Sequence, residues 1–104
     1  MTGPDIRAVV YREREWWIIQ ILEYDLVTQV RRLEDVPGEL GRLILGQIQV
    51  NTEHGVEPFH GFSKAPRRYW EMYERARDLV TPVRLADTGQ ELETPPWIEA
   101  RLAA

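Results

Sequence analysis

The chain has 104 residues, of which 43% are hydrophobic and 29% charged, and 13 Lys and Arg against 17 Asp and Glu give a net charge of -4. These proportions are ordinary for a globular protein and exclude a disordered or fibrous chain, and the length predicts one domain over residues 1–104. Autonomous nucleic-acid binding is disfavoured, because neutralising phosphates needs a clustered excess of Lys and Arg.

The chain contains no cysteine. Disulfides, thiolate catalysis and cysteine zinc sites are therefore excluded, and a reducing cytoplasm fits. The apolar runs are far shorter than the ~20 residues that cross a bilayer. Residues 1–5 lack the charged and apolar pattern of a secretory signal. We expect a cytoplasmic protein without a membrane partner.

Three strands are predicted in the first third of the chain. Residues 6–11 alternate between two faces and are rich in β-branched side chains, which is typical of a strand. The charged residues 12–15 predict a turn through solvent. The runs 16–24 and 27–32 predict the next two strands, and the simplest arrangement is an antiparallel meander.

A helix is predicted over residues 36–53, with Asp35 as its cap and Gly55 ending it. Its apolar stripe has helical spacing, at Leu40, Leu43, Ile44 and Ile48. Pro66 predicts the start of a second helix, which helical spacing carries to Val80.

Residues 97–103 fit either a strand or a helix, and the strand is favoured because Pro96 biases its predecessor toward extended geometry. The predicted fold class is α+β, with a three- to four-stranded antiparallel sheet packed with one helix, a second helix and a C-terminal extended segment. The core would lie in residues 6–54, and the C-terminal helix and tail in residues 66–104.

The second predicted strand is apolar on both faces. Alternation places Trp17, Ile19 and Ile21 on one face, and Trp16, Ile18 and Leu22 on the other. Burying a large apolar side chain is worth about 1.5–3 kcal/mol, so Trp16, Trp17 and Ile18 should be covered in the core or in a dimer. We expect a homodimer whose tail elements wrap over the neighbouring sheet. The alternative is that residues 66–104 fold back on their own sheet.

The segment RAVVYREREWWIIQILEYDLVTQVRRLEDVPGELGRLI resembles the core domain of HicB-like antitoxins, over residues 6 to about 50. The resemblance lies in a strand, a charged turn, a strand ending in W-x-x-x-x-x-E-Y-D, a third strand beginning with V-T-Q, and a helix. It implies a three-stranded antiparallel sheet with a packed helix and a further strand, often dimeric. In complete toxin-antitoxin pairs this domain binds and silences a small RNA-cleaving toxin.

Many members of that family also carry a C-terminal DNA-binding segment, which residues 66–104 do not resemble. The short, stand-alone HicB-like proteins are therefore more similar. The acidic chain would suit a basic partner such as a toxin. Glu23, Tyr24 and Asp25, at the end of the second predicted strand, are the expected partner-binding residues.

Catalytic, cofactor and metal sites are not expected. Glu23 and Asp25 are interpreted as a recognition edge, because catalytic carboxylates usually converge from separate elements. A metal-dependent enzyme using His54, Glu57 and His60 is a third hypothesis, but these residues fall in a predicted loop without a fourth ligand. The leading interpretation is a non-enzymatic, HicB-like interaction domain. Its alternative is a structural or ligand-binding homodimer without a toxin partner.

Overall fold

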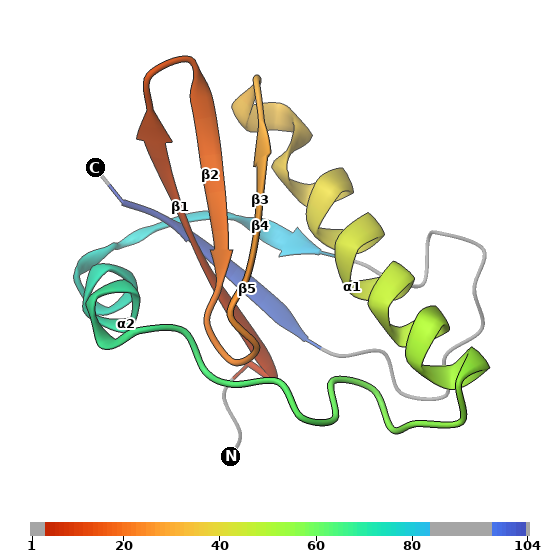
Figure 1. The fold of residues 1–104 in the computed structure, drawn as a ribbon. Coiled ribbons are helices and arrows are strands. Elements are labelled where there is room, and N and C mark those ends of the chain that lie inside the picture. Colours follow the sequence, from red (N-terminus) through yellow and green to blue (C-terminus); the bar gives the residue numbers. More distant parts are fainter. Residues whose placement is uncertain (1–3, 84–96, 104) are drawn as a thin grey trace.

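A computed structural model describes residues 4–83 and 97–103, in which a sheet carries one helix on each face (Figure 1). The strands are β1 (Ile6–Glu13), β2 (Trp16–Ile21), β3 (Leu26–Val30), β4 (Asp78–Val83) and β5 (Ile98–Leu102). The helices are α1 (Val36–Glu53) and α2 (Arg67–Arg75), and a 3-10 turn, η1 (Leu33–Asp35), precedes α1.

The five strands are ordered β3-β2-β1-β5-β4. The antiparallel meander of β1, β2 and β3 and the C-terminal strand are as predicted, and the α+β class is confirmed. The sheet is mixed rather than wholly antiparallel, because β5 pairs parallel to β1 with Ile98 opposite Ile6. Two parallel strands cannot be joined by a tight hairpin and need a long connection. Most of the chain lies between β1 and β5, which meets this requirement.

The predicted extension of the second helix to Val80 is wrong. Pro66 precedes α2 as expected, but Ala76 is already extended (φ -76°, ψ 136°), and Val80 lies in β4. Pro82 cannot occupy a helix interior, and the β-branched Val80 and Thr81 favour a strand. Strand β4 was therefore not predicted, because Ala76 and Val80 continue the helical spacing of α2.

Helix α1 has the predicted bounds, and Gly55 follows it with φ 69°. Asp35 does not cap it, because η1 leads directly into the helix. Asp35 itself is helical (φ -86°, ψ -6°) and makes no side-chain cap hydrogen bond. The 3-10 turn η1 thus begins the helix in place of the side-chain cap expected from Asp35.

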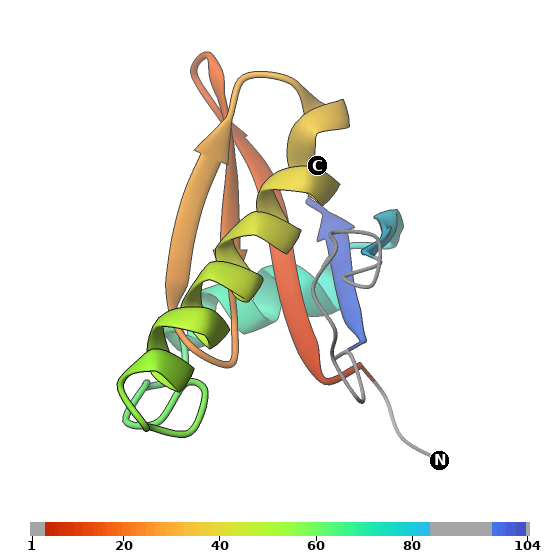
Figure 2. The same cartoon turned by 90° about the vertical axis from the view of Figure 1, so that its right-hand side faces the viewer.

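The main core lies between α1 and the sheet (Figure 2). Its fully buried side chains from the sheet and the helix include Ala8, Val10, Ile19, Ile21, Leu40, Ile44, Ile98 and Ala100. The predicted alternation of β1 and β2 and the predicted stripe of α1 account for these positions.

Helix α2 covers part of the opposite face of the sheet. Val9 and Leu22 are completely buried there, in a smaller cluster with Ala65 and Tyr73. Helix α2 thus covers part of its own sheet, as the alternative to the wrapped dimer proposed for the C-terminal part of the chain. The homodimer remains a prediction, but these side chains do not require it.

Candidate protein-interaction surface

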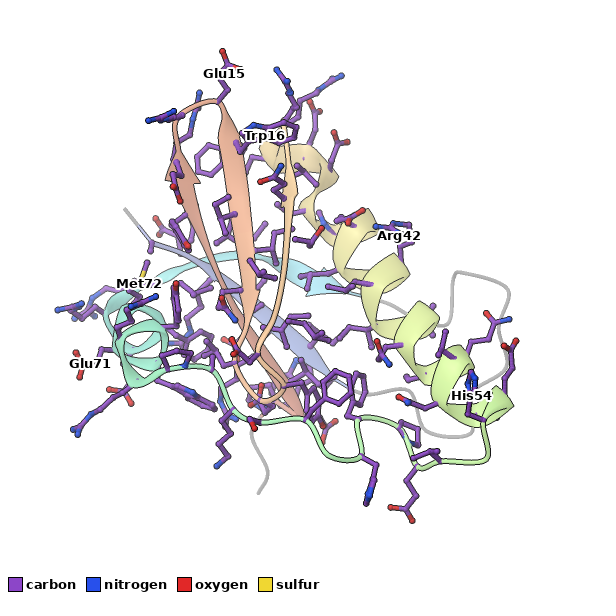
Figure 3. All side chains as sticks on the ribbon, in the orientation of Figure 1. Glu15, Trp16, Arg42, His54, Glu71 and Met72 are labelled. Carbon is purple, nitrogen blue, oxygen red and sulfur yellow. The ribbon has the colours of Figure 1, made fainter. Side chains whose placement is uncertain are left out.

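The adjacent tryptophans point to opposite faces of the sheet, and each lies under an arginine. Trp17 packs against the α1-side core, and the guanidinium carbon of Arg12 is 5.2 Å from its ring centroid. Trp16 lies on the other face, near the β1–β2 turn (Figure 3), with the guanidinium carbon of Arg31 at 4.3 Å. Both side chains are partly buried. The pair is therefore shielded by cation–π contacts in addition to burial.

Helix α2 covers β1 but does not extend over all of the sheet face on its side. The strand register aligns Tyr11, Ile18 and Gln29 in one row across β1, β2 and β3. With Trp16 and Val27, these residues form what we call the open face. Tyr11, Trp16 and Ile18 are partly buried, whereas Val27 is 60% exposed.

The open face meets α2 at a pair of tyrosines. The Tyr11 and Tyr69 rings stack with centroids 6.3 Å apart, and Arg68 donates a hydrogen bond of 2.9 Å to the Tyr69 hydroxyl. Burial, followed by the hydrogen bond with Tyr69, raises the pKa of Tyr11 to about 12. The phenol at this border is therefore neutral at physiological pH.

Of the three predicted partner-binding residues, Glu23 and Tyr24 make contacts with other residues of the same chain. The Glu23 carboxylate accepts two hydrogen bonds of 2.6 Å from Arg7, one from the backbone N–H and one from Nη1, and its side chain is 14% exposed. The Tyr24 ring stacks on Phe59, with centroids 4.0 Å apart. Only Asp25 is exposed.

Asp25 holds the turn between β2 and β3 together with Gln20. Its backbone has φ 48°, a left-handed conformation that aspartate tolerates. Gln20 is 4% exposed, and its Nε2 donates to Asp25 Oδ1 at 2.9 Å and to the Ile21 carbonyl at 3.1 Å. Gln20, the polar residue within the apolar run of β2, thus stabilises the β2–β3 turn through its side-chain hydrogen bonds.

The histidine-containing loop does not assemble a metal site. Residues 4–83 and 97–103 contain no group of three His, Asp, Glu or Cys side chains placed to hold an ion. His54, Glu57 and His60 are all exposed, and His54 Nδ1 lies 2.8 Å from the Val50 carbonyl oxygen. His54 is at the C-terminal end of α1, distant from Trp16 (Figure 3).

A hollow of about 330 Å³ lies beside α2 and is lined by Met72, Arg75, Ala76 and Ala103. These residues offer one cation and apolar surface, without a nucleophile or a general base.

No protein-family model, curated protein or solved structure matches this chain. The resemblance to HicB-like antitoxins therefore depends on the sequence segment alone and stays a prediction. Neither α1 nor α2 combines the length and apolarity that crossing a bilayer requires.

The sequence did not single out Val27 as part of the open face, nor Arg31 and Tyr69 as the residues that pack against it. Val27 carried a usable signal, because it lies at an apolar strand position on the face opposite the α1 contact. Which part of that face α2 covers depends on tertiary packing. Arg31 and Tyr69 therefore gained their roles only from the three-dimensional arrangement.

Proposed function

We propose that the chain is a non-enzymatic, HicB-like interaction domain that binds a small, basic, RNA-cleaving toxin through the open face. The observation that carries the proposal is the contrast on one sheet face. Val9 and Leu22 are fully buried under α2, whereas the neighbouring Val27 is 60% exposed. The partly exposed side chains of Tyr11, Trp16 and Ile18 lie on the same face as Val27, and a contiguous apolar patch is typical of a docking site.

The composition of the open face suits protein recognition. Aromatic residues and arginine are enriched at the centres of interfaces, where they contribute most of the binding energy. Here Trp16 stacks with Arg31, and Tyr11 stacks with Tyr69. These side chains are already ordered by their contacts, which lowers the entropy that binding costs.

Charge supports a basic partner. The chain has a net charge of -4, while the β1–β2 turn beside Trp16 is itself balanced, since exposed Arg12 and Arg14 alternate with Glu13 and Glu15. Two cations at the open face, Arg31 and Arg68, lie over aromatic rings of the same chain. The summed field of an acidic protein accelerates its encounter with a basic one.

The test is co-expression with the product of the adjacent gene, followed by purification and an assay of RNA cleavage. We expect a small basic protein that copurifies with the chain and whose cleavage of RNA the chain suppresses. A neighbouring product that does not copurify, or that cleaves RNA undiminished in the presence of the chain, would refute the proposal. If no such partner is found, the alternative of an orphan homodimer is favoured, whereas self-association alone does not distinguish the two functions.

A further inference from the structure

Strand β3 forms one edge of the sheet, and hydrogen bonding shows which of its backbone groups point outward. The Val10 carbonyl accepts from the Ala103 N–H on the β5 side at 2.8 Å, so the odd-numbered residues of β1 bond to β2. Following this alternation through the registers, Leu26, Thr28 and Val30 bond to β2. Val27 and Gln29 therefore direct their N–H and C=O groups away from the sheet.

The two edges of the sheet differ in how they are protected. Edge β4 carries Pro82, which has no N–H, and a register shift between Leu79 and Thr81. Edge β3 contains neither proline nor lysine, its register with β2 is continuous over residues 26–30, and Val27 on it is 60% exposed. Proline, lysine and bulges are the devices that keep an edge from pairing, so β3 is the edge left able to pair.

We propose that β3 pairs antiparallel with β3 of a second copy of this chain, about a two-fold axis at Thr28. An antiparallel edge pair requires outward-pointing residues to face each other. This axis places Val27 opposite the partner's Gln29, and Gln29 opposite the partner's Val27. Each of these pairs exchanges two N–H···O bonds, so the unpaired groups of both edges are satisfied.

Charge selects this axis among the neighbouring ones. With the axis at Thr28, Asp25, in the turn before β3, and the partner's Arg31, just after β3, come to the same end of the paired strands, and symmetry repeats the pair. Asp25 is exposed although it accepts from Gln20, and the Arg31 side chain is 62% exposed although it contacts Trp16 and Glu15. An axis at Val27 would place Asp25 opposite the partner's Gln29, and one at Gln29 would place Val27 opposite the partner's Arg31. Opposite charges across strands stabilise pairing, and like charges oppose it.

The pairing would join two open faces into one continuous surface. Val27 and the partner's Gln29 would then lie side by side on the same sheet face, because directly opposite residues share a face. Figure 2 shows β3 at one side of the sheet and α1 against its face. This inference goes beyond the proposed function and does not depend on a toxin, since it concerns the chain alone.

Sedimentation equilibrium of the full chain tests the pairing. The wild-type chain is expected at twice the mass of one copy. Asp25→Lys and Arg31→Glu each place like charges at both ends of the paired strands, so each should weaken association by about tenfold or more. In an equimolar mixture, the introduced lysine faces the introduced glutamate and the native Arg31 faces the native Asp25. The mixture should therefore associate as the wild type does.

Controls separate this result from misfolding. Arg75→Glu makes the same charge change as Arg31→Glu at an exposed position of α2, and it should leave the dimer intact. Asp25→Asn tolerates φ 48° and removes only the charge, so it should weaken association less than Asp25→Lys. Circular dichroism confirms folding of each variant.

The inference is wrong if the wild-type chain has the mass of one copy up to about 1 mM, where even weak association is measurable. It is also wrong if both charge reversals associate like the wild type, or if their mixture fails to recover association. None of these results bears on toxin binding, which the co-purification tests separately.

Discussion

Arg31 lies over the ring of Trp16, with its guanidinium carbon 4.3 Å from the ring centroid. The contact joins the end of β3 to the start of β2 and covers a tryptophan that α2 does not reach. It also brings Arg31 to Glu15, at 3.3 Å from Oε2. A partly buried aromatic residue at the open face is thus held in a fixed orientation by its own chain.

Arg31→Ala is expected to lower the free energy of unfolding by about 0.5–1 kcal/mol, because an exposed cation–π contact contributes about that much. Urea unfolding followed by circular dichroism measures the change. Arg67→Ala is the control, since the Arg67 side chain is 91% exposed and its ion pair with Glu71 is on the surface. Equal losses in the two variants would show that the ring contact adds nothing.

Glu23→Gln should destabilise the chain by about 1–3 kcal/mol, because it removes a charge-assisted partner of Arg7 from a largely buried position. Glu34→Gln is the matched control, since both side chains of the Arg32–Glu34 pair are mostly exposed. It should cost less than about 0.5 kcal/mol. If Glu23→Gln is as mild as the control, then Glu23 is not an anchor and could serve a partner, as the sequence predicted.

Acid should weaken the contact between β3 and α1. Hydrogen bonds from Arg42 and then from Thr28 lower the pKa of Glu39, although burial opposes the shift. The stabilisation is therefore present above the ordinary value of 4.5 and is lost as the pH falls through the lowered folded value. Glu39→Gln should be less stable than the wild type at neutral pH and about equal at the acidic end of a urea-unfolding series. A stability difference that did not narrow in acid would show that the Glu39 carboxylate does not stabilise the fold through Thr28 of β3 and Arg42 of α1.

Alkali should act on the border between the open face and α2. The pKa of Tyr11 is raised from 10.0 to about 12, so the folded state holds its proton longer than the unfolded state does. The protonated Tyr11 therefore stabilises the fold fully below pH 10, and this stabilisation is lost as the pH rises toward about 12. Burial also raises the pKa of Tyr24 and of Tyr73, so tyrosinate absorbance should show several late-titrating groups, of which Tyr11→Phe removes one. A late absorbance change of undiminished size in Tyr11→Phe would contradict the assignment to Tyr11.

The sequence predicted the parts of the fold that depend on local pattern. The alternation in 6–11 and 16–22 and the stripe of α1 appear as predicted, because strand and helix periods determine which side chains share a face. The end of α2 was missed because Ala76 and Val80 keep helical spacing while the chain turns into β4. The parallel entry of β5 beside β1 is a property of topology, which no local pattern records.

The candidate site was less accessible to sequence reasoning. Glu23, Tyr24 and Asp25 were expected to recognise a partner because they are polar and end a strand. The structure directs Glu23 to Arg7 and Tyr24 to Phe59, and both partners are distant in the sequence. Such long-range partners decide whether a charged or aromatic residue is available, and a single sequence does not specify them.

The most direct test of the central claim, that the open face binds a protein, is calorimetric titration of the chain with the adjacent gene's product. Ile18→Glu places a charge within the open face and should weaken binding by about 30-fold or more, as expected for a residue at an interface centre. Val50→Glu is the control, because Val50 is 48% exposed on α1, away from that face, and should bind as the wild type does. Equal affinities for Ile18→Glu and Val50→Glu, with both variants folded, would contradict the account.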